Sequence, residues 1–146
     1  MHGLPGPIAP FDPDISAMLD EVVVAVAPKH LLAACETLRE DPRMGFDYLR
    51  CLTVVDYEET LQVVYHLWSR DHRHKLTLKT SVPTDDPVAP SVTGVWPGAD
   101  WFEREGHELF GVVFAGHPDL RPLLLWEGFE GYPGRKSYPF NEYTEW

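Results

Sequence analysis

The sequence has too few cysteines for a metal or redox site built on thiolates. Its 146 residues include only two, Cys35 and Cys51. An iron–sulfur cluster takes about four thiolates and a zinc ribbon takes paired Cys-x-x-Cys motifs, so neither is expected. Both cysteines stand among apolar residues, which is typical of reduced cysteines in a protein core.

Long apolar runs are also missing. The longest extends from Val22 to Ala27, far short of the roughly 20 residues that a membrane-spanning helix needs. The N-terminus has no basic segment followed by an apolar one, so no signal peptide is expected. These features predict a cytoplasmic protein that inserts no segment into the membrane and reaches it only through a partner.

Positive charge is scarce. Twelve Lys and Arg residues face 23 Asp and Glu residues, which gives a formal net charge of −11. Nucleic-acid phosphates and anionic lipid headgroups repel such a chain, so the composition argues against binding nucleic acid or the membrane directly. The simplest role of the acidity is solubility.

Motifs of catalysis and cofactor binding are absent or incomplete. Neither Gly-x-Gly-x-x-Gly nor Gly-x-Ser-x-Gly occurs. His107-Glu108 begins like a zinc-protease motif, but Gly111 stands where the second histidine belongs. A di-iron Glu-x-x-His pair fails because Arg104 precedes His107 by three residues. The sequence therefore predicts no catalytic residue, no bound cofactor and no metal ligand in this chain.

The N-terminal half contains one clear helix pattern. Pro28 suits the first turn of a helix, and apolar residues follow at i, i+3, i+4 and i+7. These residues are Leu31, Ala34, Cys35 and Leu38. Before them, the β-branched run from Val22 to Ala27 favours a buried strand. Ser16 is placed to cap a short helix that reaches Glu21.

The middle of the chain predicts an antiparallel meander. Apolar and polar residues alternate over 61–69 and 76–82, after a first strand over 46–55. Val92 to Trp96 is a candidate fourth strand. Residues 100–110 predict a helix in which Asp100 and Glu103 form an acidic analogue of a capping box, and Gly111 is placed to end it.

The last 35 residues combine many prolines and glycines with eight aromatic residues. Such a segment cannot form long helices, yet it has too many aromatic rings for a free disordered tail. We therefore expect it to bury its rings against this domain or another protein. The predicted organisation is an irregular N-terminal arm (1–14), a core domain (15–115) and an extended C-terminal segment (116–146) that docks on a partner.

The fold class that follows is α+β, in two layers. A mixed, mostly antiparallel sheet carries helices on one face, and an irregular arm rich in Pro, Gly and aromatic residues follows it.

Charged residues on the 100–110 helix and on two later segments are the candidate docking residues. Pro118 and Pro122 stiffen a loop that presents an acid and a base, and two further cations follow in an otherwise acidic chain. Arginine can bind a carboxylate through two hydrogen bonds. The candidates are Glu103, Arg104, Glu105, Asp119, Arg121, Arg135 and Lys136. Pairing of these charges within the domain is an equally open alternative.

Several of these motifs together resemble a known family. The order and spacing of Glu103-Arg104-Glu105, Glu108 to Gly111, Gly116 to Arg121, Gly128 to Gly131 and Tyr138-Pro139 are similar to those of the C subunit of bacterial respiratory complex I. That family is the small hydrophilic component of the peripheral arm of the NADH:quinone oxidoreductase. Gly106 and His107 depart from its pattern, in which a larger apolar residue and an aromatic are expected, and so predict either looser packing of this helix or a different neighbour for it.

The resemblance implies a scaffold rather than a catalyst. It places the chain beside the subunit that shapes the quinone pocket and other peripheral-arm subunits, on the cytoplasmic side of the membrane. FMN, iron–sulfur clusters and quinone are then expected in the partner subunits, and the isolated chain is expected to have no activity. Two alternatives stay open: the equivalent subunit of a membrane-bound hydrogenase or of a non-NADH quinone oxidoreductase, and an independent hydrolase built on the Glu/His cluster.

Overall fold

A computed structural model describes residues 6–11, 13–18, 21–120 and 130–137 of the chain. In chain order, its elements are the 3-10 helix η1 (Gly6–Phe11), β1 (Asp14–Met18), β2 (Glu21–Ala25), α1 (Pro28–Glu40), β3 (Tyr48–Asp56), β4 (Thr60–Ser69), β5 (His74–Pro83), β6 (Val88–Pro90), α2 (Ala99–Phe110) and β7 (Val113–Ala115).

Five strands form one mixed sheet in the order β1-β2-β5-β4-β3. The β3–β4, β4–β5 and β1–β2 pairs are antiparallel, whereas β2 runs parallel to β5, with Val22 opposite Leu76. The predicted meander is therefore confirmed, and the predicted strand from Val22 joins its free edge. β6 and β7 form a separate two-stranded parallel sheet.

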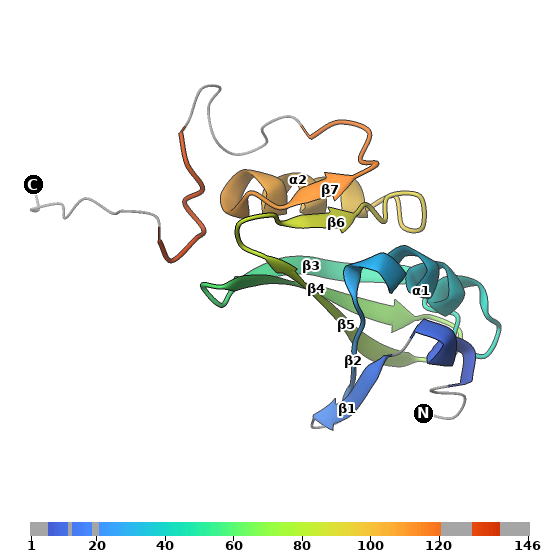
Figure 1. The fold of residues 1–146 in the computed structure, drawn as a ribbon. Coiled ribbons are helices and arrows are strands. Elements are labelled where there is room, and N and C mark those ends of the chain that lie inside the picture. Colours follow the sequence, from blue (N-terminus) through green and yellow to red (C-terminus); the bar gives the residue numbers. More distant parts are fainter. Residues whose placement is uncertain (1–5, 12, 19–20, 121–129, 138–146) are drawn as a thin grey trace, which may run out of the picture.

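Both α-helices lie on the same face of the large sheet, together with β6 and β7 (Figure 1). Within the described residues, the opposite face carries no helix (Figure 1). The apolar side of α1 is buried through the four residues that its spacing predicts, Leu31, Ala34, Cys35 and Leu38. The predicted two-layer α+β class is confirmed.

Two short predicted elements are wrong. Ser16 does not cap a helix, because residues 14–18 form β1, in which Ser16 pairs with Val23 of β2. Val92 to Trp96 is a tight turn, since the amides of Val95 and Trp96 both donate to the Val92 carbonyl. The strand of this region is β6 instead, which pairs with β7 rather than with the large sheet.

The predicted end of the second helix is confirmed. Gly111 adopts a left-handed conformation with φ of 80°, and its amide donates to the His107 carbonyl. The prediction of looser packing at Gly106 is wrong. This glycine is buried, and a Cβ atom added to it would lie 3.2 Å from Val54 Cγ2. The missing side chain therefore lets α2 approach β3 closely.

The N-terminal arm contributes to the core through Ile8 of η1, which is fully buried. Phe11 lies against the His30 ring of α1, with the ring centroids 6.2 Å apart. The boundaries predicted at residues 14/15 and 115/116 stay predictions. Most of the C-terminal segment, at 121–129 and 138–146, lies outside the described residues.

Candidate docking site

Glu103, the first candidate, is a fully buried carboxylate at the start of α2. Its Oε1 accepts a hydrogen bond of 2.6 Å from Ser91 Oγ, and its Oε2 accepts one of 2.8 Å from the Val92 amide. The helix begins at Gly98 without a side-chain cap, so the predicted capping box is wrong. Glu103 instead fastens the 91–93 loop to the helix.

Burial sets the electrostatics of this carboxylate. Desolvation raises the pKa of Glu103 above its ordinary value, although the hydrogen bonds from Ser91 and Val92 oppose the shift. Burial also raises the pKa of Cys35, and the Glu103 charge adds to that effect. Glu103 therefore places an ionisable carboxyl in the core. This carboxyl favours its protonated form more than a carboxyl in water does.

A histidine joins the start of α2 to the segment that carries Asp119. His117 has a buried side chain, and its Nε2 lies 2.9 Å from Asp100 Oδ1. Its Nδ1 accepts a hydrogen bond of 2.8 Å from the Asp119 amide, so the ring proton that faces Asp100 is on Nε2. This arrangement fixes the backbone of Asp119 while the residue remains exposed.

Arg104 and Glu105 lie on the outward side of α2. Glu105 is exposed, and Arg104 is half-buried with its guanidinium carbon 5.6 Å from the centre of the Trp101 ring. Trp101 itself is 57% exposed. An exposed tryptophan beside an arginine is a composition typical of protein interfaces.

Residues 130–137 attach to the other end of α2. The Gly134 amide donates to the Leu109 carbonyl at 2.8 Å, and Arg135 Nε donates to the Phe110 carbonyl at 2.7 Å. The Arg135 guanidinium also lies 4.9 Å from the centre of the Tyr132 ring. Arg135 thus satisfies a carbonyl at the helix terminus that has no partner within the helix.

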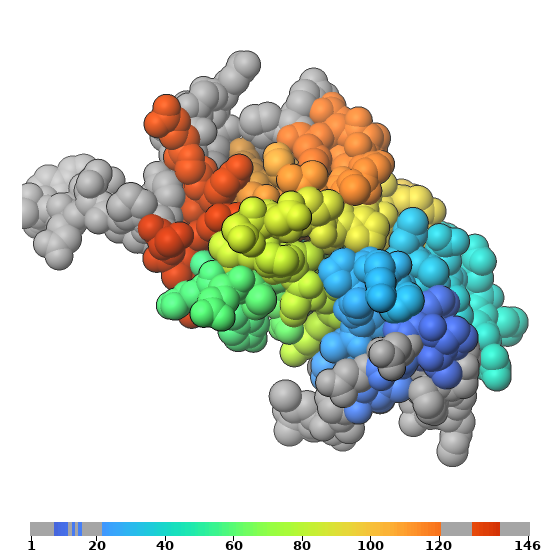
Figure 2. All heavy atoms as spheres, in the orientation of Figure 1, coloured from blue at the N-terminus to red at the C-terminus, as the bar shows by residue number. Residues whose placement is uncertain are grey.

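The same segment is attached to the end of β3 through Asp56. The Lys136 amide donates to Asp56 Oδ2 at 2.7 Å, and the Glu58 amide donates to Oδ1 at 2.6 Å. Burial alone would raise the pKa of Asp56, but these bonds and the charges of Lys136 and Arg135 lower it overall. Figure 2 shows the 130–137 segment, in red, against the turn after β3, in green. The Lys136 side chain remains exposed.

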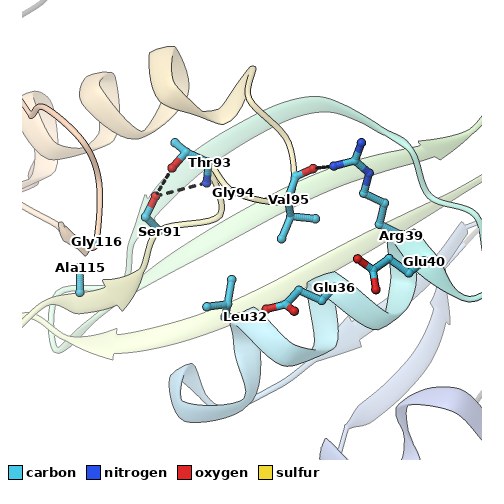
Figure 3. Close-up of a pocket in the computed structure, with 10 residues that line it drawn as sticks. All are labelled: Leu32, Glu36, Arg39, Glu40, Ser91, Thr93, Gly94, Val95, Ala115 and Gly116. Atoms are coloured by element: carbon cyan, nitrogen blue, oxygen red, sulfur yellow. Dashed lines mark hydrogen bonds between the residues drawn. The ribbon is translucent and has the colours of Figure 1, made fainter.

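A groove of about 500 Å³ lies between α1 and the 91–95 loop (Figure 3). Glu36 and Glu40 line it from α1, and Ser91 and Thr93 line it from the loop, with their hydroxyl oxygens 2.9 Å apart. Arg39 closes one end by donating to the Val95 carbonyl. Ser91 therefore connects the groove to the buried Glu103.

The described candidate residues thus lie along α2 and beside its two ends; the helix is roughly 18 Å long for its 12 residues. Asp119 lies near its start, Arg135 and Lys136 lie near its end, and Arg104 and Glu105 lie between. Arg121 lies outside the described residues. Sequence reasoning missed Ser91, His117 and Asp56 as the residues that hold these segments in place.

Two further features bear on the site. No group of three or more His, Cys, Asp and Glu side chains in the described part of the chain could hold a metal ion. No helix among the described residues has the length and apolar character to cross a membrane.

Comparison with known proteins gives a consistent set of relatives. The family described as "Respiratory-chain NADH dehydrogenase, 30 Kd subunit" matches residues 24–144. The C 2 subunit of the NADH-quinone oxidoreductase of Rhizobium etli is 45% identical over 126 residues, covering 84% of this chain and 67% of the relative. The C subunit of the NADH-quinone oxidoreductase of Coxiella burnetii is 40% identical over 159 residues, covering 86% and 70%.

Solved structures show the same fold. A chain described as "Nqo5 of the trypsin-resistant fragment (1-134)" is 31% identical with a TM-score of 0.64, over 75% of this chain and 90% of that one. A chain of a membrane-bound sulfane sulfur reductase, an archaeal respiratory membrane complex, has a TM-score of 0.78 at 24% identity, over 90% and 79%. At that identity the second likeness shows the fold alone.

Proposed function

The chain belongs to the family of the 30-kDa subunit of respiratory-chain NADH dehydrogenase, and on that premise we propose that it docks the quinone-reducing module of the complex. The resemblance to the C subunit of respiratory complex I is confirmed by the match over residues 24–144 and by relatives at 40 to 45% identity. The chain is a peripheral-arm subunit of a proton-pumping NADH:quinone oxidoreductase, and other subunits of that assembly are its partners.

The neighbour that we propose is the subunit that shapes the quinone pocket, on the cytoplasmic side of the membrane. The exposed side of α2 supports a contact with another protein there, because Trp101, Arg104 and Glu105 combine an aromatic ring with both signs of charge. The exposed residues Asp119 and Lys136 extend the surface toward the two ends of the helix. Permanent interfaces of this kind commonly bury more than about 2,000 Å².

The isolated chain, in this proposal, has no activity. The fully buried carboxylate of Glu103 is bound to Ser91 and Val92 rather than directed at a substrate, and His117 is held between Asp100 and the Asp119 amide. FMN, iron–sulfur clusters and quinone then belong to the partner subunits. Stoichiometric zinc or iron in the purified chain would instead favour a hydrolase.

Purification of a tagged full-length chain from native membranes tests the function. We expect the other subunits of the complex to be recovered with it, including a flavoprotein that oxidises NADH. Recovery of hydrogenase subunits, or of a quinone oxidoreductase that lacks this flavoprotein, would support the alternative enzymes.

Arg104→Ala tests the docking surface within the same experiment. The variant should fold, because Arg104 is on the outward side of α2, but should recover less of the quinone-site subunit. Lys29→Ala, which removes an exposed cation from α1, is the matched control and should recover as much as the unchanged chain. Equal recovery by both variants would remove Arg104 from the docking surface.

A further inference from the structure

The face of the large sheet that carries no helix is a second surface with a composition of its own. Side chains alternate along each strand, so the residues between the core positions of β3, β4 and β5 point away from the helices. Register pairs them across the strands, for example Thr53 with Val64, and Val64 with Lys79. The outward residues are Tyr48, Arg50, Cys51, Thr53 and Val55 of β3, Gln62, Val64, His66 and Trp68 of β4, and Lys75, Thr77, Lys79 and Ser81 of β5.

Formal charge on the β3, β4 and β5 part of this face has one sign, whereas β1 and β2 add Asp14 and Glu21 at outward register positions. Arg50, Lys75 and Lys79 are its charged residues, and no outward position of β3, β4 or β5 is Asp or Glu. The chain as a whole carries −11, so the three strands reverse the charge of the rest of the molecule. We refer to these three cations and the outward residues around them as the cationic face.

The cations of this face have no carboxylate partner among the residues that the structure describes. The nearest acid in sequence, Asp47, already forms an ion pair of 2.8 Å with Arg70. Arg50 instead lies over the Trp68 ring, 5.8 Å from its centre. A register shift between Leu49 and Cys51 inserts Arg50 as an extra residue in β3, and such bulges re-aim a side chain.

One end of the cationic face has the composition of an interface hot spot. Tyr48 is opposite Trp68 in the register, and Trp68 is opposite Lys75. Tyr48 is 53% exposed. Beside them, a depression of about 380 Å³ is lined by Arg50, Cys51, His66, Leu67 and Lys75. Trp, Tyr and Arg are the residues most enriched where a few side chains supply most of the binding energy.

We propose that the cationic face binds an acidic surface of a neighbouring subunit, with an Asp or Glu side chain of that subunit seated between Arg50 and Lys75. The proposal rests on the proposed function, because it needs the assembly to supply the partner. Arg50 offers a forked guanidinium and Lys75 a point charge, which together suit one carboxylate. Tyr48 and Trp68 supply the apolar contact around it.

Other occupants fit this face less well. A second copy of the chain would bring like charges together across a two-fold contact. Recognition of an anionic lipid surface commonly uses clusters of four to eight Lys and Arg residues, and this face has three in a chain of net charge −11. A carboxylate on a folded partner needs only the local pair.

Zero-length coupling tests the partner chemistry directly. The native complex, purified through the tagged full-length chain, is treated with a carbodiimide, which joins a lysine amine to a carboxylate that it contacts. We expect Lys75 or Lys79 to couple to an Asp or Glu of another subunit. We also expect acetylation of Lys75 to be suppressed in the complex relative to the free chain, while Lys29 on α1 reacts equally in both.

Charge reversal gives the functional measure. Lys75→Glu should lower recovery of the partner subunit roughly tenfold, a free-energy difference of about 1.4 kcal/mol. Lys75→Arg should retain most of it because the charge is kept. Lys29→Glu changes the net charge by the same amount at an exposed site on the covered side of the sheet, and should change nothing. Equal thermal melting of the free variants establishes that each one folds.

The outcomes separate this proposal from the proposed function. If the chain recovers the oxidoreductase but Lys75 stays as reactive as in the free chain, the cationic face is not an interface and the proposal is wrong. If the chain recovers no oxidoreductase subunit, both are wrong. Binding of the free chain to vesicles of anionic phospholipid, abolished by Lys75→Glu, would assign the face to the membrane and also overturn the proposal.

Discussion

Two segments that pack beside α2 are each held by one buried carboxylate, and the two carboxylates behave in opposite ways. At the start, Glu103 holds the 91–93 loop through Ser91 and Val92. At the end, Asp56 holds the 130–137 segment through the Lys136 amide. Each accepts two hydrogen bonds, yet the pKa of Glu103 is raised and the pKa of Asp56 is lowered.

The difference arises from what surrounds the bonded oxygens. Burial dominates at Glu103, whose neighbours include the core residues Cys35 and Tyr65. Burial is the largest single effect at Asp56 as well, but the two backbone donors and the charges of Lys136 and Arg135 together outweigh it and lower the pKa. Glu103 therefore acts as part of the core. Asp56 instead attaches the 130–137 segment to the end of β3 by accepting a hydrogen bond from an amide 80 positions away in the sequence.

Removal of the Glu103 carboxylate should have the largest effect. Glu103→Ala leaves the Val92 amide buried without a partner, which costs about 1 to 3 kcal/mol. It also removes the hydrogen bond from the Ser91 hydroxyl, which then keeps only Thr93 as a partner. We expect urea unfolding to show a loss of about 3 kcal/mol. Glu103→Gln keeps the shape and one acceptor, and should lose less. If Glu103→Ala lowers the free energy of unfolding by less than a substitution at an exposed residue does, the 91–93 loop does not depend on Glu103.

Asp56→Ala should have a smaller and more local effect. The Lys136 and Glu58 amides lose an acceptor but lie close enough to the surface to bond to water, so we expect a loss of about 1.5 kcal/mol. Amide hydrogen exchange should accelerate at Lys136 and Gly134 while the amides of β4 stay protected. Uniform acceleration across the molecule would make Asp56 a core residue like Glu103.

Gly134→Ala tests the attachment of the 130–137 segment to α2 without changing a carboxylate. An added Cβ would lie 2.7 Å from the Phe110 ring, so the segment or the ring has to move. We expect a loss of about 1 kcal/mol from overpacking, with faster exchange of the amides at 130–137. Gly94→Ala is the matched control, because a Cβ there meets nothing within 4 Å. Identical exchange in both variants would contradict the observed packing.

The smallest expected effect is a difference in pH dependence. A carboxyl whose pKa is raised on folding binds more protons in the folded state, so stability falls as pH rises through that pKa. As pH falls from 7 toward the ordinary glutamate range, the free energy of unfolding of the wild type should therefore rise relative to that of Glu103→Gln. A lowered pKa has the reverse effect. At still lower pH, the free energy of unfolding of the wild type should therefore fall relative to that of Asp56→Asn. For each variant, the difference in free energy of unfolding from the wild type is plotted against pH. Equal slopes of the two plots would show that the two sites do not differ.

The sequence predicts the long elements well and the short ones poorly. Alternation over β5 and the four-residue apolar face of α1 are local signals, because each element buries one side of a regular structure. β1 and β6 have five and three residues. β1 forms only by pairing with the next strand, β2, and β6 only by pairing with the remote strand β7. No local pattern shows that β2 pairs in parallel with β5.

The candidate site shows the same limit. Glu103, Arg104 and Glu105 are neighbours in sequence, but helical geometry turns Glu103 inward and leaves Glu105 exposed. A buried charged residue is rare unless it is paired. The partners of Glu103 are Ser91 and Val92, and Val92 is in a segment expected to be a strand. Asp56 comes directly after the strand expected over 46–55, and nothing in the sequence relates it to residue 136.

The parallel pairing of β2 and β5 has a consequence for synthesis of the chain on the ribosome. β1, β2 and α1 leave the exit tunnel first, yet the strand that accepts β2 follows only after β3 and β4 have emerged. The nascent N-terminal hairpin therefore exposes the unpaired edge of β2 until the meander is complete. Closing such a non-local contact is slow compared with forming adjacent hairpins, so the meander is expected to serve as the template onto which the older strands are added.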